Sequence, residues 1–345
     1  MTVKGKVAAR SPTPKRPKGS PHDGIEGPGR TQEKPMSYTK LHMKFAVAIS
    51  TILLCASAFA ATENLSFTTI DNPSDPTFNQ LLGIDKSGVI SGYFGSGAPG
   101  HPNKGYITAP PYTTFESDNL PGSTQTQATG IANNGVTVGF WSPTNAGGDA
   151  NFGFIREANG FTYLSVNNPL GASSPQVQQV LGINTSNIAV GFYTDANNLA
   201  QGYAYNVKTG AFTPVTTMGA VSATATGINN HGLICGFFTN AGGKVQGFLQ
   251  NLQGNSKITF AVPGSPNTQL FGVNDGGIVV GSYIDGAGVQ HGLSYNATTG
   301  NWTTIDDPNA AGMTVVNGIN DKGDAVGFYL DAAGNTHGML VTGVH

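Results

Sequence analysis

The sequence predicts an all-β fold, a six-bladed β-propeller of four-stranded blades whose ring is closed by an N-terminal strand that completes the last blade. Three observations favour this fold. The 345 residues include 49 glycines and only 10% charged residues, a composition that supplies turns rather than charged helical faces. A glycine-marked unit occurs six times at nearly constant spacing. The sixth copy lacks a last strand, and a matching segment lies before the first copy.

The N-terminal region differs from the repeats. Residues 1–44 carry ten of the 17 basic residues and six prolines without an apolar pattern, which indicates a disordered basic leader over 1–42 or a start placed too far upstream. Residues 43–60, "MKFAVAISTILLCASAFA", have a lysine, an apolar run and a small-x-small end. This pattern is typical of a signal peptide and is short for a membrane span. Translation could begin at Met1, Met36 or Met43.

Cleavage after Ala60 would leave a single domain over 61–345. That part holds seven basic and sixteen acidic residues, a formal charge of −9, which makes nucleic acid an unsuitable partner. It retains only Cys235, so no intrachain disulfide can form. We expect a monomer that is secreted to an extracellular or periplasmic location and is not attached to a membrane once the signal peptide is removed.

The repeat is defined by three positions. Each copy opens with a glycine, has a second glycine nine residues later, and has glycine or asparagine five residues after the first. The opening residues are Gly83, Gly130, Gly182, Gly227, Gly272 and Gly318, at spacings of 47, 52, 45, 45 and 46. The middle position is Gly88, Gly135, Asn187, Gly232, Gly277 and Gly323. Because asparagine tolerates a left-handed backbone better than other non-glycine residues, we predict a hairpin turn with positive φ there.

Each copy can be divided into four short strands, which is the size of a propeller blade. The fourth strand of the fifth copy is "WTTID" at 302–306, and "FTTID" at 67–71 is its near match. The N-terminal segment is therefore predicted to be the fourth strand of the sixth copy. This arrangement closes a ring and removes an exposed sheet edge, whereas an open solenoid, the alternative, would leave one.

The third strand of several copies begins with a short motif. It reads "QGY" at 201–203, "QGF" at 246–248, "HGL" at 291–293 and "HGM" at 337–339. The unit resembles the extracellular HAF-type repeat of secreted bacterial proteins, named for a His-Ala-Phe step, with glycine in place of alanine. The resemblance implies an exported repeat protein without an established catalytic activity.

Sequence signatures of common enzyme classes are absent. The chain has no P-loop, Rossmann glycine fingerprint, G-x-S-x-G, H-E-x-x-H or paired C-x-x-C. The turns around "YLDAAGNTHG" lack the D-x-D-x-D spacing of a calcium loop. His291 and His337 occupy equivalent positions in neighbouring copies, too far apart in a ring to share one metal ion, so we expect them to bond nearby backbone.

Two sets of residues are candidates for ligand binding. Three residues before four of the opening glycines lie Gln80, Gln127, Gln179 and Gln269, near one mouth of the predicted channel. They either contact a polar ligand or hydrogen-bond between blades. The second set is an acidic face with only Lys104 and Lys244 to offset it, in which Asp195, Asp285 and Asp331 are the leading candidates. The predicted face contains Asp71, Asp75, Asp118, Asp149, Asp195, Asp285, Asp306, Asp307 and Asp331.

The functional prediction is a secreted, non-enzymatic module that binds a glycan, a cell-surface component or another protein. One alternative is an extracellular carbohydrate- or lactone-processing enzyme with an acidic active face. The other is a purely structural surface module. No cofactor is expected, and calcium is the one candidate ion, because an acidic face attracts divalent cations.

Overall fold

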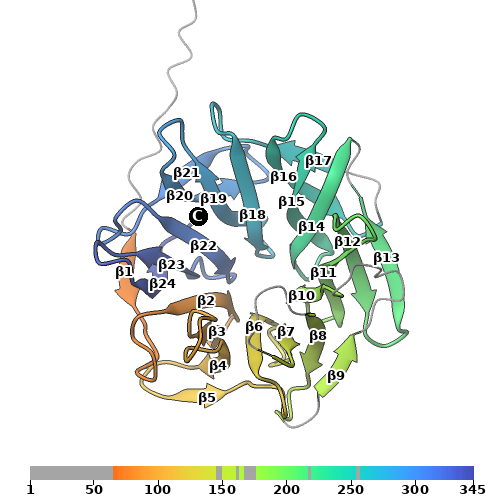
Figure 1. Ribbon diagram of the computed structural model, residues 1–345. Coiled ribbons are helices and arrows are strands. Elements are labelled where there is room, and N and C mark those ends of the chain that lie inside the picture. Colours follow the sequence, from red (N-terminus) through yellow and green to blue (C-terminus); the bar gives the residue numbers. More distant parts are fainter. Residues whose placement is uncertain (1–64, 145–149, 161–162, 167–175, 217–218, 254–256) are drawn as a thin grey trace, which may run out of the picture. The chain divides into compact units, whose positions relative to one another are not determined.

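The computed structural model describes residues 65–144, 150–160, 163–166, 176–216, 219–253 and 257–345. Within these ranges the chain forms 24 strands and no helix. The strands lie in antiparallel groups around a common centre (Figure 1). The all-β prediction is confirmed, while the predicted leader and signal peptide fall outside the described residues.

The strands form six sets that follow one another along the chain. The first set is β2 (Asn79–Ile84), β3 (Ile90–Phe94), β4 (Lys104–Thr108) and β5 (Phe115–Ser117). The second is β6 (Gln125–Ile131), β7 (Thr137–Ser142), β8 (Phe152–Arg156) and β9 (Tyr163–Val166). The third is β10 (Gln178–Ile183), β11 (Ile188–Thr194), β12 (Ala200–Asn206) and β13 (Ala211–Val215).

The second half of the chain repeats this order. The fourth set is β14 (Ala220–Ile228), β15 (Leu233–Asn240), β16 (Val245–Asn251) and β17 (Lys257–Phe260). The fifth is β18 (Asn267–Val273), β19 (Ile278–Ile284), β20 (Gln290–Asn296) and β21 (Trp302–Ile305). The sixth is β22 (Thr314–Ile319), β23 (Ala325–Leu330), β24 (Thr336–Thr342) and β1 (Ser66–Thr69).

Hydrogen bonding divides the six sets into five sheets. The fourth and fifth sets share one eight-stranded sheet because a single parallel pair, Val245 with Asn267, joins β16 to β18. The other four sets are separate four-stranded sheets. Parallel bridges at the corresponding place also link other neighbouring sets, and they join Phe78 with Thr336, Asn151 with Val177 and Gln290 with Met313. The eight-stranded sheet thus consists of two four-stranded sets, joined by the same kind of parallel link that joins other neighbouring sets.

The N-terminal strand completes the sixth set. β1 pairs antiparallel with β24, with Ser66 opposite Thr342 and Thr69 opposite Met339. The pairing continues one residue further, because the Ile70 backbone N donates to the Gly338 carbonyl at 2.9 Å. The predicted pairing of the first strand with the last copy is confirmed.

The opening glycines lie where the six inner strands β2, β6, β10, β14, β18 and β22 approach one another. A Cβ on Gly83 would lie 2.9 Å from the Gly130 Cα, and the series continues around the centre until a Cβ on Gly318 would lie 3.1 Å from the Gly83 Cα. Only glycine permits this contact between backbones, which explains why the first position of every copy is invariant within the chain.

The positive φ predicted for the middle position of the repeat is confirmed. The turn between the first two strands has φ of 87° at Gly88, 81° at Gly323 and 60° at Asn187. The single asparagine adopts the same left-handed conformation as the glycines, as the sequence pattern required.

Hydrophobic clusters lie between neighbouring sets. One cluster packs Val190 of the third set against Ile234 and Phe248 of the fourth, and another packs Ile70 of the sixth against Leu81 of the first. The clusters thus join neighbouring sets through side chains of several strands, and other residues of the inner strands line a cavity at the centre.

Candidate functional site

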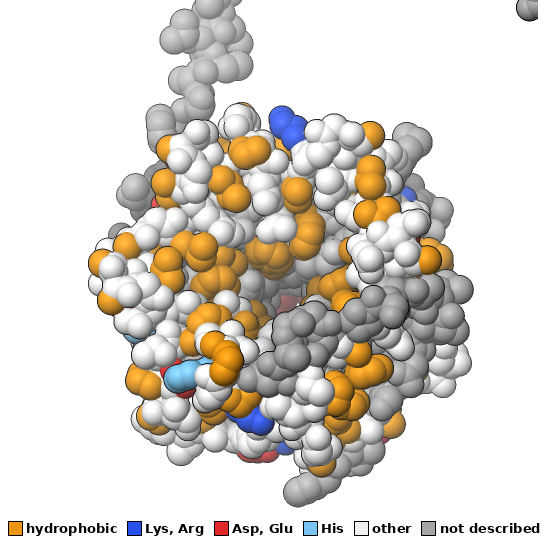
Figure 2. All heavy atoms as spheres, in the orientation of Figure 1, with side chains coloured by type: hydrophobic (Ala, Val, Ile, Leu, Met, Phe, Trp, Pro, Cys, Tyr) orange, Lys and Arg blue, Asp and Glu red, His pale blue; other side chains and the backbone are white. Residues whose placement is uncertain are grey.

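A cavity of about 270 Å³ lies at the centre of the inner strands. We call it the axial cavity. Figure 2 shows the central hollow on one face of the molecule, with hydrophobic side chains around its rim. The register of each inner strand slips just before its opening glycine, as between Leu81 and Gly83 or between Leu270 and Gly272. Such a β-bulge adds one residue and redirects its side chain. These six bulge residues line the axial cavity, and they are Leu82, Thr129, Leu181, Thr226, Phe271 and Asn317.

The polar bulge residues connect neighbouring sets. The Thr129 Oγ1 donates to the Val180 carbonyl at 2.7 Å, and the Asn317 Nδ2 donates to the Leu81 carbonyl at 2.9 Å. Thr226 makes the same link to the next inner strand. The bulge residues were not singled out from the sequence, although they directly precede the opening glycines, because a bulge cannot be recognised without the pairing register.

Three of the four predicted glutamines, Gln80, Gln127 and Gln179, line the axial cavity. Gln269, at the equivalent position of the fifth set, is not part of the lining. The Gln127 Nε2 donates to Asn103 of the first set at 2.9 Å. The Gln179 Nε2 donates to Asn151 of the second set at 2.8 Å. The Gln80 Oε1 accepts from the Tyr93 hydroxyl at 2.8 Å. The amides therefore border the cavity while being held by other side chains.

The described lining of the axial cavity contains no ionisable side chain. Its polar groups are carboxamides, threonine hydroxyls and backbone amides, and its apolar groups include the half-buried rings of Phe140 and Phe271. Phe271 is held in place by Phe237, whose ring lies 6.1 Å away at 82°. The cavity thus combines aromatic faces with neutral groups that can both donate and accept hydrogen bonds.

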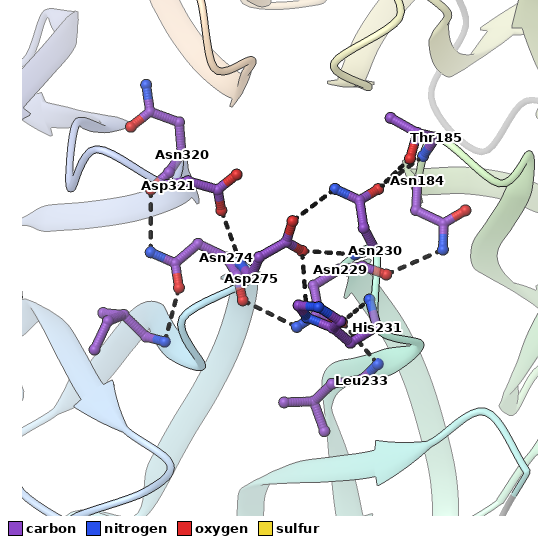
Figure 3. A network of polar contacts seen from close by, with 11 residues as sticks. Asn184, Thr185, Asn229, Asn230, His231, Leu233, Asn274, Asp275, Asn320 and Asp321 are labelled. Atoms are coloured by element: carbon purple, nitrogen blue, oxygen red, sulfur yellow. Dashed lines mark hydrogen bonds and ion pairs between the residues drawn. The ribbon is translucent and has the colours of Figure 1, made fainter.

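A smaller polar cavity of about 70 Å³ adjoins the axial cavity and shares part of its lining. Figure 3 shows the polar contacts of residues that line it. Four asparagine side chains there point from one turn toward the next, and we call them the asparagine ring. The Asn184 Nδ2 donates to the Asn229 carbonyl at 3.0 Å, and the Asn229 Nδ2 donates to the Asn274 carbonyl at 3.0 Å. Asn274 continues the series to Asn320, which reaches the Asp85 carbonyl at 3.1 Å.

The asparagine ring is incomplete at the first two sets. Asp85 occupies the equivalent position in the first set, and its carboxylate caps its own turn by accepting from Ser87 N and Val89 N. Ala132 occupies the position in the second set. Neither side chain can donate the hydrogen bond that an asparagine supplies. Further contacts join the fourth and fifth sets next to the asparagine ring. The Asp275 carboxylate accepts hydrogen bonds from Asn230 N and from Asn230 Nδ2, both at 2.8 Å.

The predicted aspartates Asp195, Asp285 and Asp331 lie in three separate hairpins and not in the axial cavity. Each carboxylate accepts two backbone N–H groups of its own turn. For Asp331 the donors are Ala333 N and Asn335 N, both at 2.8 Å. These bonds from Asn335, together with those from His337 and Ala333, lower the pKa of Asp331 to about 2. The three aspartates therefore have a structural role as turn caps.

His337 and His291 each bridge two aspartates. The His337 Nδ1 lies 2.7 Å from Asp71 and its Nε2 lies 3.2 Å from Asp331. His291 makes the same contacts with Asp306 and Asp285. The two rings stack on Tyr329 and Tyr283, with centroids 5.2 and 5.1 Å apart. The prediction that these histidines bond nearby backbone was wrong, because their partners are carboxylates. Asp331 and Asp285 lie six residues before their histidines, whereas Asp306 and Asp71 lie on other strands or loops, 15 and 266 residues away.

The predicted acidic face is not fully exposed. Asp75, Asp118 and Asp307 are buried, and Asp149 lies outside the described residues. The Asp118 carboxylate lies 3.3 Å from the Arg156 Nε and accepts from the Thr137 hydroxyl at 2.8 Å, which links the first set to the second. Burial raises the pKa of Asp118 to about 6, and the bonds to Thr137 and Arg156 only partly offset it. Sequence position alone could not distinguish this interior pair from solvated turn acids.

Among the described residues, no group of three or more histidine, cysteine, aspartate or glutamate side chains is arranged to hold a metal ion. The described part of the chain also contains no helix that could cross a membrane.

Comparison with known proteins places the fold. No protein-family model and no curated protein sequence matches the chain. The structure is similar to that of a putative TolB from Agrobacterium tumefaciens, with a TM-score of 0.55 and 11% identity over 80% of this chain and 97% of that one. It is also similar to AofleA from Arthrobotrys oligospora, with a TM-score of 0.52 and 11% identity over 80% of this chain and 85% of that one. For TolB from Acinetobacter baumannii the TM-score is 0.50 and the identity is 10%, over 78% of this chain and 64% of that one.

These identities are too low to transfer a function, and they show the fold alone. The protein has an all-β, propeller-type fold built from antiparallel four-stranded sets. The resemblance to HAF-type repeats stays a prediction.

Proposed function

We propose that the protein is an exported, non-enzymatic binding module, a six-bladed β-propeller whose axial cavity takes an uncharged polar ligand such as a sugar residue of a cell-surface glycan. The number of blades is supported by the glycine contacts, which run through six inner strands and return to the first. It is also supported by the single parallel pair in the eight-stranded sheet, which has counterparts between other neighbouring sets.

The observation that carries the ligand class is the neutral lining of the axial cavity. A charged ligand would lose its hydration there without meeting an opposite charge, at a cost of several kcal/mol. A neutral ligand with hydroxyl or amide groups could bond to Gln80, Gln127 and Gln179, while its apolar side could contact Phe271. Typical ligand sites measure about 300 to 1,000 Å³. At 270 Å³ the cavity suits a small molecule or the terminal unit of a longer chain.

The test is a glycan-array screen of the full-length protein combined with a hydrolysis assay on any glycan that binds. We expect binding without turnover, and release of cleavage products would favour the enzyme alternative. Gln127→Leu should then weaken ligand binding at least tenfold. Without the Gln127 amide, a polar group of the bound ligand would be buried without a hydrogen-bond partner. Gln269→Leu is the matched control, since Gln269 is the equivalent residue outside the lining. Equal effects of the two substitutions would place the ligand elsewhere.

Calcium at the turn aspartates Asp195, Asp285 and Asp331 is a separate proposal. A calcium titration of thermal stability tests it, with the Asp285→Asn and Asp331→Asn variants for comparison. No rise in the melting temperature at millimolar calcium would contradict it, because an ion that binds only the folded state must stabilise that state. We also propose that the protein is a monomer, which light scattering after gel filtration would check.

A further inference from the structure

A second cavity, of about 390 Å³, lies away from the centre in the first set. We call it the outer cavity. It lies between the segment that enters the first set, Asn72–Ser74, and the strands β3, β4 and β5. The remaining lining residues are Phe94, Lys104, Gly105, Tyr106, Thr113, Phe115, Ser117 and Asn119.

One wall of the outer cavity is formed by the half-buried rings of Phe94 and Phe115, which pack against the buried ring of Tyr106. The centroid of Tyr106 lies 6.4 Å from that of Phe94 in a stacked arrangement and 5.1 Å from that of Phe115 in an edge-to-face arrangement. The Tyr106 hydroxyl is buried and has no hydrogen-bond partner among the described residues. Buried hydroxyls normally have one, so this wall includes an unused polar group.

The register of the repeats shows why this place differs from its counterparts. In the sixth set the position of Phe94 is Tyr329, and the position of Lys104 is His337. Tyr329 bonds to Thr69 through its hydroxyl at 3.0 Å and stacks against His337, which in turn bonds to Asp71. These side chains close on one another across the outer strands.

The fifth set closes in the same way. Its tyrosine, Tyr283, bonds to Thr304 at 3.0 Å and stacks on His291. The first set cannot form this arrangement, because Phe94 has no hydroxyl and the Lys104 Nζ turns to the Thr124 carbonyl at 2.8 Å. The outer cavity is therefore a position of the repeat at which two residue differences remove the contacts that close the fifth and sixth sets.

The outer cavity has a single charged lining residue, Lys104, and no carboxylate among the lining residues. The bond to Thr124 uses one of the three ammonium hydrogens, so two remain for a ligand. The nearby Asp71 carboxylate is already bonded to Gly338 N at 3.0 Å and to His337. Residues 61–345 have a formal charge of −9, and at physiological ionic strength interactions between exposed charges are screened beyond about 8 Å. Lys104 is therefore the one charged residue of the described lining that a ligand in the outer cavity would meet.

We propose that the outer cavity binds a sugar ring that carries a carboxylate, such as a hexuronic acid unit of an acidic polysaccharide. The apolar face of the ring lies against the aromatic wall, and the carboxylate meets the Lys104 ammonium. The ring hydroxyls bond to the side chains of Ser117 and Asn119 at the rim. This site is separate from the axial cavity and has the opposite charge preference, so it is independent of the function proposed above.

The test is calorimetric titration of the full-length protein with sodium D-glucuronate and, separately, with D-glucose. Glucuronate should bind at least tenfold more tightly than glucose. Lys104→Gln should reduce glucuronate affinity at least tenfold, whereas Lys244→Gln, at an exposed turn, should leave it unchanged. Ser117→Leu changes an exposed strand residue and should block the cavity without unfolding the protein. Melting temperatures of all variants confirm that each is folded.

Three results obtained with the wild-type protein and the outer-cavity variants would overturn the proposal. They are the absence of glucuronate binding, equal binding of glucuronate and glucose, and glucuronate binding that survives both Lys104→Gln and Ser117→Leu. A Gln179→Leu variant separates the two sites, because Gln179 lines the axial cavity and bonds to Asn151 of the second set, whereas Gln127 bonds to Asn103, the neighbour of Lys104. If Gln179→Leu weakens glucuronate binding, the acidic sugar enters the axial cavity and the outer site is refuted.

Discussion

Removal of the N-terminal strand should destabilise the whole ring. The comparison is between a chain that starts at Leu65 and one that starts at Pro73, which lacks residues 65–72, including β1, Ile70 and the buried Asn72. Ile70 is only 5% exposed and packs in the cluster with Leu81 and Leu340, so its loss costs about 2 to 5 kcal/mol as a core deletion. The backbone hydrogen bonds to β24 add about 1 kcal/mol each.

The sum exceeds about 5 kcal/mol, a large share of the roughly 5 to 15 kcal/mol that stabilises a folded protein. With about 2 °C lost per kcal/mol in a large domain, the melting temperature should fall by at least 10 °C. Differential scanning calorimetry measures the difference, and gel filtration shows whether the uncovered edge of β24 causes association. A melting temperature within two degrees of that of the longer chain would refute the closed-ring interpretation.

A single substitution at Ile70 tests the same junction more mildly than removal of the strand, and it has a matched control. Ile70→Ala in the full-length chain should cost about 2 to 4 kcal/mol, because the side chain fills the space between the sixth and first sets. Ile258→Ala, on the outer strand β17 where the side chain is 43% exposed, should cost less than about 1 kcal/mol. Similar losses at the two sites would show that Ile70 does not connect the ends of the ring.

Three further predictions concern the turns, the glycine contacts and the histidines. Gly323→Val should lower stability by more than about 1 kcal/mol because φ is 81° there, whereas Asn187→Gly should be nearly neutral in urea unfolding. Gly182→Ala should also destabilise, since its Cβ would lie 3.1 Å from the next glycine Cα, and a neutral result would contradict the close backbone approach. Partial burial lowers the pKa of His337, but the hydrogen bonds that its ring donates to Asp71 and Asp331 outweigh this effect, so the folded-state pKa is raised above 6.5. The stabilisation is thus complete below pH 6.5 and is lost as the pH rises through the folded-state pKa, so the melting-temperature difference between wild type and His337→Gln should shrink from pH 5 to pH 8.

The features that could be predicted from the sequence are those that the backbone imposes on every copy. Glycine recurs at Gly83 and its equivalents because two backbones meet there, and the exchange of glycine for Asn187 showed the left-handed turn. The pairing of β1 with β24 could be predicted because its strand sequence repeats that of β21. Constraints of this kind leave the same residue type at the same spacing, so a single sequence is enough to show them.

Features that depend on one pair of side chains were not predictable in this way. Asp118 resembles a solvated turn acid in sequence, yet it pairs with Arg156 inside the protein. The outer cavity depends on the absence of a hydroxyl at Phe94 and on the direction that Lys104 takes. These properties follow from side-chain packing between segments that are remote in sequence. The repeat pattern shows only what the copies share, so it does not contain them.

The junction between β1 and β24 also has a consequence for the order in which the protein can be assembled. β1, the first strand of the described residues, forms its hydrogen bonds with β24, the last of them, across a separation of more than 260 residues. Five sets can form as their strands are synthesised, but the sixth must wait until Met339 and its neighbours have emerged. A contact of such long range is slow to form, and until then β1 remains an unpaired strand that another chain could capture. β1 is therefore open to misassembly throughout the synthesis of the strands between it and β24.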